Sequence, residues 1–403
     1  MKILFLASWF PYPPDNGAKI RTYYLLKALC EKEDIHLVSL YQEEPEQEHL
    51  NHIKNICSIH SLHKIKKYKP NTIKSLLGYF STKPRSFIDT YDKKVANAVD
   101  IAAKDINPDV IIVSTMGMVD YIPKNTNTLL VLEQHNCEYA ILKRAAEKIN
   151  NPIKKLKAEL GWKKYSKWEY KVCSWFDVIT EVSNNDKILI QKIAKRDLNI
   201  EVIPNGVETS IYDYDNWDPD INTIIYNGAL TYSANYYAVK YYADEIYPLL
   251  KNKYPNLKLY VTGKTDSVDV SYFENHNGII LTGYIKSMPE ILKKSSACIV
   301  PLKDGGGSRL KILEAMAQGV PVVSSSIGIE GINAHNNKEV LIADNPNDFS
   351  NAIDKILNDK ILVSELRANA RKLVVENYDW KIIGNKFVEV IYNNYKIKHS
   401  TGN

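Results

Sequence analysis

Short apolar runs alternate with longer segments of helical period along the whole chain, and this alternation restricts the fold more than any other feature. Such alternation is typical of βαβ units around a parallel sheet. Expected strands are 3–7, 35–40, 110–114, 129–133, 178–181 and 201–203, then 223–226, 257–262, 279–281, 297–301, 321–324 and 339–342. Helical stretches include 18–31, 93–104 and 153–175. The pattern predicts an α/β protein with two Rossmann-like halves.

The length of 403 residues exceeds what one hydrophobic core usually supports, so two domains are expected. Pro and Gly interrupt the pattern at 203–207, which places the boundary between residues 205 and 206. The acidic stretch 212–220 follows and contains two Asp-x-Asp triplets. Because they lie in a proline-containing linker, we interpret them as solvated turn carboxylates and expect no metal site.

Five cysteines are scattered without a C-x-x-C pair, which argues against a disulfide framework and a zinc site and fits a reduced cytoplasmic compartment. No uninterrupted apolar run reaches the length of a membrane span. The N-terminal apolar run is followed by a Trp- and Pro-containing segment, so we interpret it as a buried first strand and not a cleavable signal. These features predict a cytoplasmic protein.

Charge is distributed unequally between the two halves. Residues 1–200 hold 31 Lys and Arg against 23 Asp and Glu, a balance of +8, whereas the remainder has 21 against 24, a balance of −3. Segment 61–88 has seven basic residues and no acid, segment 143–171 has ten against three acids, and aromatic residues are interspersed in both. We interpret them as a peripheral contact with an anionic membrane, in preference to nucleic acid or solvated helix faces.

The strongest motif is the stretch Asp304-Gly-Gly-Gly-Ser-Arg-Leu-Lys-Ile-Leu-Glu-Ala-Met316, between an apolar strand and a helix. Helix amino termini at the carboxyl ends of parallel strands attract anions. The candidate anion-binding residues, which predict a diphosphate site, are Gly306, Gly307, Ser308, Arg309 and Lys311. Glu314, farther along the helix, is placed to accept bonds from two ribose hydroxyls, with a solvated helix charge as the alternative.

In the first half, two positions follow expected strands. Gly17 permits close backbone approach to a sugar or phosphate, although an ordinary turn explains it equally well. His135 follows the strand 129–133, where it is placed to bond a substrate hydroxyl or the reacting centre, and we favour this over a structural role. Asn136 and Glu138 are candidates to orient His135 or to cap the next helix, and for Asn136 we favour the cap.

Three glycine turns in the second half supply further candidates. Asn227 and Gly228 follow its first strand, and Lys264 follows its second. Lys264 is a candidate phosphate ligand, with a surface lysine as the commoner explanation. Gly283 and Tyr284 offer backbone groups for a base edge, or form only a turn.

The chain resembles the retaining family 4 glycosyltransferases of the GT-B fold. The resemblance covers nearly the whole chain and rests on the Pro-x-Pro-x-x-x-Gly loop ending at Gly17, on Ile203-Pro-Asn-Gly-Val-Glu208, on Tyr226-Asn-Gly-Ala229, on Thr282-Gly-Tyr284, on 306–319, and on Tyr378-x-Trp380. It implies two Rossmann-like domains facing each other across a cleft, with a last helix crossing back. The implied domains are 1–205 plus 384–403, and 206–383.

The resemblance also implies roles. The second domain would bind a nucleotide sugar through Leu310 and the candidates above, with Arg309 and Lys311 on the diphosphate, Glu314 on the ribose and His135 near the transferred sugar. The first domain would bind a glycan or lipid-linked acceptor in assembly of surface polysaccharide, lipopolysaccharide or capsule. Transfer with retention, without metal or cofactor, is implied.

Two departures from the family pattern stand out. Gly306 occupies a position where the family often has Glu, and the common Arg and Lys pair is absent between residues 228 and 235. Other hypotheses are a different GT-B enzyme, either a nucleotide-sugar epimerase or a phosphorylase, and an inactive membrane-docked scaffold. Cellular function that survives Arg309→Ala and Glu314→Ala would favour the scaffold.

Overall fold

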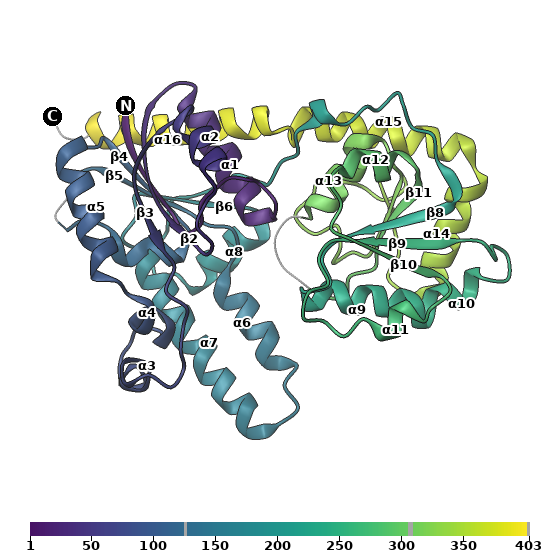
Figure 1. Cartoon of the computed structure of the whole chain (residues 1–403), viewed down its shortest axis with the longest axis horizontal. Helices are drawn as coiled ribbons and strands as arrows, with labels where there is room; N and C mark the ends of the chain where they lie inside the picture. The colour runs from purple at the N-terminus through teal and green to yellow at the C-terminus, as the bar shows by residue number, and fades with distance from the viewer. Residues whose placement is uncertain (125–126, 305–308, 401–403) are drawn as a thin grey trace. The chain divides into compact units, whose positions relative to one another are not determined.

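The computed structural model describes residues 1–124, 127–304 and 309–400 (Figure 1). The chain forms two compact units, one of Met1–Pro204 with the segment from Ile383 onward, and one of Asn205–Ile382. These limits lie one residue from the boundaries expected at 205/206 and 383/384. Each unit is built around its own parallel sheet, as predicted for two Rossmann-like halves.

Unit 1 contains a seven-stranded parallel sheet in the order β3-β2-β1-β4-β5-β6-β7. Its strands are β1 (Lys2–Ala7), β2 (Asp34–Tyr41), β3 (Ser58–Lys64), β4 (Val110–Ser114), β5 (Leu129–Glu133), β6 (Val178–Glu181) and β7 (Ile200–Val202). The central strands β4 and β5 are apolar up to their last residues, Ser114 and Glu133, because both faces of the sheet are covered by helices. Strand β3 was not expected from the sequence. It is an edge strand of sequence Ser-Ile-His-Ser-Leu-His-Lys whose residues are half-buried or exposed.

Most helices of unit 1 pack on its sheet, whereas residues 73–90 and the outer parts of the two helices within 138–173 extend away from it (Figure 1). The helices of this unit are α1 (Gly17–Cys30), α2 (Gln47–Lys54), α3 (Ile73–Leu77), α4 (Arg85–Thr90), α5 (Lys93–Ile106), α6 (Glu138–Glu147), α7 (Pro152–Cys173) and α8 (Asn184–Ile193), with 3-10 turns η1 (Gly78–Phe80) and η2 (Met116–Tyr121). Asn16 caps α1 by accepting the N–H of Lys19. Residues 8–16 connect the carboxyl end of β1 to this capped helix start.

Unit 2 contains a six-stranded parallel sheet in the order β10-β9-β8-β11-β12-β13. Its strands are β8 (Asp220–Asn227), β9 (Lys258–Thr262), β10 (Ile279–Gly283), β11 (Ser295–Val300), β12 (Val322–Ser324) and β13 (Leu341–Ile342). Its helices are α9 (Ser233–Tyr241), α10 (Tyr247–Leu250), α11 (Ser271–Glu274), α12 (Met288–Lys293), α13 (Leu310–Gln318), α14 (Pro346–Asn358) and α15 (Lys360–Asn377), with η3 (Thr209–Ile211) and a π-helical turn η4 (Tyr242–Ile246).

The last helix, α16 (Trp380–Ser400), begins in unit 2 and continues into unit 1, which confirms the expected return of the chain. Asn394 accepts a bond from Asn199 (2.7 Å), and Lys398 pairs with Asp177 (2.8 Å). Within unit 2, the N–H of Val207 donates to the Tyr378 carbonyl (2.8 Å), and the N–H of Trp380 donates to the Val207 carbonyl (3.1 Å). There Gly206 is required, because a Cβ would lie 2.8 Å from the Tyr378 carbonyl oxygen.

Strand order reverses once in each sheet, beside β1 and β4 in unit 1 and beside β8 and β11 in unit 2. Such reversal points leave a crevice at the carboxyl ends of the strands where ligands bind. The residues at these ends are Ser8 and Thr115 in unit 1 and Asn227 and Leu302 in unit 2. The topology of both sheets therefore predicts ligand binding at the same strand ends that carry the candidate motifs.

Candidate functional site

In unit 2 the predicted ribose ligand and the first glycine turn come together. Asn227, the last residue of β8, donates a hydrogen bond from Nδ2 to the Oε2 atom of Glu314 on α13. The Asn227 Oδ1 atom accepts a bond from Thr262 Oγ1 at the end of β9 (2.9 Å). Three adjacent elements thus fix the Glu314 carboxylate at the carboxyl edge of the sheet.

Lys311 is held one helical turn before Glu314. Its Nζ atom donates to Asn235 Oδ1 (2.9 Å) and lies 4.0 Å from the centroid of the Tyr226 ring. The same Asn235 oxygen accepts the Tyr226 hydroxyl (2.7 Å), and its amide nitrogen donates to the Ala229 carbonyl (2.8 Å). A Cβ at Gly228 would lie 2.6 Å from Lys311 Nζ. The ammonium therefore occupies space that only glycine leaves open.

The two charged groups of this site influence each other. Burial and the neighbouring Arg309 charge together lower the pKa of Lys311 to about 7, and the Glu314 charge opposes this decrease. Burial raises the pKa of Glu314 to about 7, although the Lys311 charge and hydrogen bonds from Tyr212 and Asn227 oppose this rise. A bound anion would favour the charged form of Lys311. Perturbed groups of this kind at a strand edge are typical of functional sites.

The other unit 2 candidates lie around this cluster. Arg309 is buried immediately before α13, and Leu310 begins that helix and packs against the core. Lys264 is exposed after β9, and Tyr284 is exposed after Gly283, which ends β10 with a φ of 67°. Gly306, Gly307 and Ser308 lie outside the described residues. The structure therefore joins Asn227, Gly228, Lys311 and Glu314 by direct contacts, while Lys264, Gly283 and Tyr284 share their sheet edge.

In unit 1, His135 is fixed by a buried ion network. Its Nε2 atom lies 3.0 Å from Glu133 Oε2, which also accepts the Ser114 hydroxyl (2.8 Å). Arg21 on α1 pairs through Nε with Glu133 Oε1 (2.5 Å). Burial alone would raise the pKa of Glu133, but the charges of His135 and Arg21 hold it well below its ordinary value. Because the carboxylate only accepts, Nε2 of His135 carries the proton.

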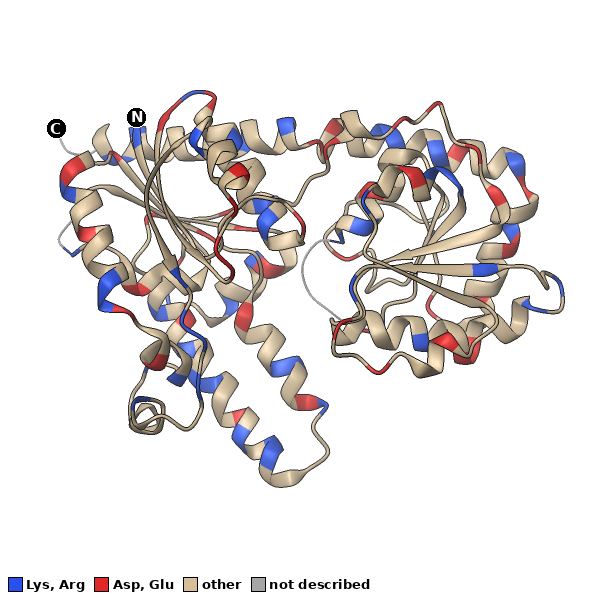
Figure 2. Ribbon diagram, in the orientation of Figure 1, with Lys and Arg blue, Asp and Glu red and all other residues tan. Residues whose placement is uncertain are grey.

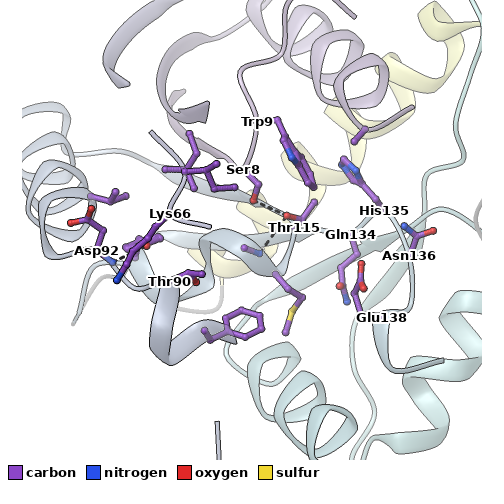
Figure 3. A pocket seen from close by; sticks show the side chains of 18 of the residues that line it. Ser8, Trp9, Lys66, Thr90, Asp92, Thr115, Gln134, His135, Asn136 and Glu138 are labelled. Atoms are coloured by element: carbon purple, nitrogen blue, oxygen red, sulfur yellow. Dashed lines mark hydrogen bonds between the residues drawn. The ribbon is translucent and has the colours of Figure 1, made fainter. Parts of the chain in front are cut away.

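This histidine borders a pocket of about 320 Å³ at the carboxyl edge of the unit 1 sheet (Figure 3). Trp9 stacks beside His135, with ring centroids 5.8 Å apart. Ser8 and Thr115 hydroxyls are 2.7 Å apart, and Thr115 has a φ of 67°, a rare conformation for a non-glycine residue. Gly17 is exposed at the start of α1, and its neighbour lines the pocket. The pocket offers an aromatic wall and several hydroxyl-binding groups.

Asn136 was expected to cap the helix after His135, and this prediction is wrong. Helix α6 begins at Glu138 after Cys137, which makes no side-chain cap bond. Instead Glu169, far along α7, accepts the N–H groups of Glu138 and Tyr139 (3.0 and 2.9 Å). A remote carboxylate replaces the local cap because the two helices pack together as a hairpin. Asn136 lines the pocket instead.

Sequence reasoning missed several residues of these sites. In unit 2 they are Tyr226, Asn235 and Thr262, and in unit 1 they are Arg21 and Glu133. Asn235 lies within the stretch where the expected cation pair is absent, so that departure was a signal pointing to it. For Glu133 the signal was an acid at the end of an otherwise apolar strand.

The Asp-x-Asp triplets of 212–220 take part in local structure. Asp218 pairs with Lys294 (2.5 Å), and Asp220 accepts the N–H of Asn222 (2.9 Å) and the Thr223 hydroxyl (3.3 Å). Asp218 precedes the sheet, as expected for the linker, whereas Asp220 is the first residue of β8 and therefore lies at a strand start.

Comparison with known proteins identifies the domain that carries the first site. Residues 221–359 match the family model of the glycosyl transferases group 1. A protein described as an uncharacterized 44.6 kDa protein in the cps region of Klebsiella pneumoniae is 25% identical over 178 residues, 42% of this chain and 46% of its own length. An uncharacterized glycosyltransferase of Methanocaldococcus jannaschii is 27% identical over 223 residues, 49% of this chain and 54% of its own length. The matches thus span about half the length of these relatives.

Solved structures resemble the entire chain. Sucrose-phosphate synthase from Thermosynechococcus elongatus superposes with a TM-score of 0.71 at 16% identity, covering 98% of this chain and all of that one. Anabaena HepE in complex with UDP and glucose gives 0.68 at 14% identity, with 98% of this chain and 100% of that chain covered. The predicted GT-B fold is confirmed by these structures, and the match to the glycosyl transferases group 1 family is confined to residues 221–359.

Proposed function

We propose that the protein is a glycosyltransferase that moves a sugar from a nucleotide-sugar donor to a hydroxyl group of a glycan or lipid-linked acceptor. The observation that carries this proposal is the convergence of Asn227, Lys311 and Glu314 at the carboxyl edge of a glycosyl transferases group 1 domain. A cation and a carboxylate one turn apart match the two polar parts of a nucleoside diphosphate. The HepE complex with UDP and glucose supports a nucleotide-sugar donor.

In this proposal Arg309 and Lys311 hold the diphosphate, and Glu314 accepts the ribose hydroxyls. The cations stabilise negative charge that develops on the departing diphosphate, so no metal or cofactor is needed. Transfer with retention, as in the family 4 enzymes, belongs to the same proposal. His135, oriented by Glu133 and Trp9, contacts the transferred sugar.

The acceptor is proposed to bind at unit 1. Its pocket combines an aromatic wall with hydroxyl, amide and carboxyl groups, as polyhydroxylated ligands require. The relative from a cps region supports a role in surface polysaccharide assembly. Peripheral contact of the basic first half with an anionic membrane at the inner face of the cell membrane completes the proposal, because lipid-linked acceptors are membrane-bound.

A screen of nucleotide sugars tests the donor directly. We expect one nucleoside diphosphate sugar to raise the melting temperature of the full chain, because a ligand that binds only the folded state stabilises it by mass action. The same sugar should be hydrolysed slowly without acceptor. A panel of uridine, guanosine, adenosine and thymidine diphosphate sugars, compared by thermal shift and by product release, makes the measurement. Absence of any shift and of any turnover would contradict the proposal.

Replacing Gly228 by alanine should displace the Lys311 ammonium, since the new Cβ would lie 2.6 Å from its present position. Loss of a charge-assisted hydrogen bond to diphosphate should raise the dissociation constant about tenfold or more. Calorimetry with nucleoside diphosphates measures the change. Gly161→Ala is the matched control, because nothing lies within 4 Å of its added Cβ. Equal affinities of both variants would show that Lys311 does not contact the ligand.

A further inference from the structure

The segment around α3 exposes its apolar side and buries its polar side. Ile73, Leu76, Leu77 and Phe80 follow the spacing of one helix face, and all four are exposed, Ile73 by 78% and Phe80 by 93%. Between them, Ser75 and Gly78 are buried. An ordinary surface helix buries its apolar face and exposes its polar face. The exposed apolar row is therefore not part of the core of unit 1 and indicates a surface that binds something else.

Polar contacts hold this segment in place from beneath. Arg85 on α4 donates to the Ser75 carbonyl (2.7 Å) and the Tyr79 hydroxyl (2.6 Å), with its guanidinium 3.9 Å from the Tyr79 ring centroid. Asp89 accepts the N–H of Lys69 (2.8 Å) and the Thr72 hydroxyl. The apolar row is therefore presented by a fixed scaffold.

A second apolar row lies on α7. Ile153, Leu156 and Leu160 are spaced along one face of this helix and are exposed by 81%, 63% and 63%. Lys164, the next residue on that face, donates to the Gly78 carbonyl of η1 (2.7 Å), and this bond places the two rows beside each other in unit 1. Figure 1 shows α3, α4 and α7 extending on the same side of the unit 1 sheet. We call these seven residues the apolar surface.

Exposed cations lie on the same segments as the apolar surface. They are Lys67, Lys69 and Lys74 near α3, and Lys154, Lys155, Lys157, Lys163 and Lys167 on α7. Lys66 donates to the Asp89 carbonyl (2.6 Å). Figure 2 shows Lys and Arg distributed along α7. Residues 61–88 contain no acidic residue, and residues 152–167 contain one, Glu159, which is half-buried. No helix in the described ranges is long and apolar enough to cross a membrane.

We propose that the apolar surface inserts into the interfacial region of an anionic lipid bilayer while the surrounding lysines contact lipid headgroups. Apolar insertion and attraction between cations and anionic lipids are each weak, and stable anchoring takes both. A partner protein with an apolar surface would explain the two apolar rows but not the exposed lysines beside them, whereas an anionic bilayer explains both. This inference rests on the membrane contact proposed above and not on sugar transfer.

Vesicle flotation with the full chain tests the proposal. Wild-type protein should float with vesicles of phosphatidylglycerol and phosphatidylcholine and remain in solution with phosphatidylcholine alone. Leu77→Glu/Phe80→Glu and Leu156→Glu/Leu160→Glu should each weaken flotation about tenfold or more. Lys154→Glu/Lys155→Glu should weaken it and reduce its salt dependence. Ile101→Glu, on α5 with 55% exposure in wild type, is the matched control and should float normally.

Two measurements keep failure of this inference separate from failure of the proposed activity. Each variant should keep its melting temperature and its affinity for nucleoside diphosphate in solution, because these substitutions lie in unit 1 on exposed positions. Wild-type protein that ignores anionic vesicles, or an Ile101→Glu variant as weak as Leu77→Glu/Phe80→Glu, would overturn the proposal. A dimer that Leu77→Glu/Phe80→Glu dissociates, without vesicle binding by wild type, would overturn it in favour of self-association.

Discussion

Arg309→Ala is expected to lower kcat/KM for sugar transfer by about 10²- to 10³-fold, the effect of removing one donor that stabilises transition-state charge. Arg309 is buried directly before α13, and its charge contributes to the lowered pKa of Lys311, which lies two residues later in the first turn of the helix. The loss should fall mainly on kcat, because charge on the departing diphosphate is greatest in the transition state. Steady-state kinetics with the donor found by the nucleotide-sugar screen provide the measurement.

Two further variants make this prediction specific. Arg309→Lys should recover only part of the activity, because an ammonium cannot supply the planar, bidentate contact of a guanidinium. Lys251→Ala removes an exposed cation of the same unit and should leave the kinetics unchanged. Calorimetry should show weaker binding of nucleoside diphosphate to Arg309→Ala. Unaltered affinity and turnover would remove Arg309 from the site.

Glu133→Gln should lower the free energy of unfolding by about 3–5 kcal/mol, because it leaves the buried Arg21 guanidinium without its countercharge. Arg21 also donates to the carbonyls of Ile203 (2.8 Å) and Pro204 (3.2 Å), where the chain leaves unit 1. Hydrogen exchange should therefore become faster in unit 1 and around Ile203 and Pro204, where the chain leaves this unit. Urea unfolding followed by circular dichroism gives the magnitude, and hydrogen exchange locates the change.

The same variant should alter the dependence of stability on pH. The folded pKa of Glu133 lies below its ordinary value of 4.5, so its ionised form stabilises the fold fully above that value. This contribution is lost as the pH falls below 4.5 toward the folded pKa. The difference in the free energy of unfolding between wild type and Glu133→Gln should therefore become smaller as the pH is lowered. Glu147→Gln, which removes an exposed carboxylate 3.9 Å from Lys143, is the control and should change stability little at any pH. A constant difference across this range would contradict the ion-pair explanation.

The sequence predicted the central strands accurately because parallel strands covered on both faces must be continuously apolar. Strands β4 and β5 were expected at the bounds that the structure gives them. At the sheet edge this rule fails, since one side of β3 is not covered and its histidines and serines break the apolar run. Helix ends were predicted less well where a remote group caps them, as Glu169 caps α6.

Site prediction followed the same division. The motif 304–316 and the positions after strands could be found from local order alone, because parallel strands bring their carboxyl ends to one edge. The hydrogen-bond and ion-pair partners of these residues could not be predicted from local sequence order. The Asn227–Glu314 bond joins residues 87 apart in sequence, the Lys311–Asn235 bond 76 apart, and the Arg21–Glu133 pair 112 apart.

The sequence by itself determined that this chain forms two parallel-sheet units and that glycine, cation and carboxylate meet at a helix start, because periodicity and spacing are local properties of the chain. Only the tertiary structure decided that Asn235 holds Lys311, that Glu133 and Arg21 hold His135, and that the α3 segment presents its apolar side outward. Those arrangements depend on which side chains, far apart in sequence, are buried against each other in the folded chain. Local sequence patterns do not identify such contacts.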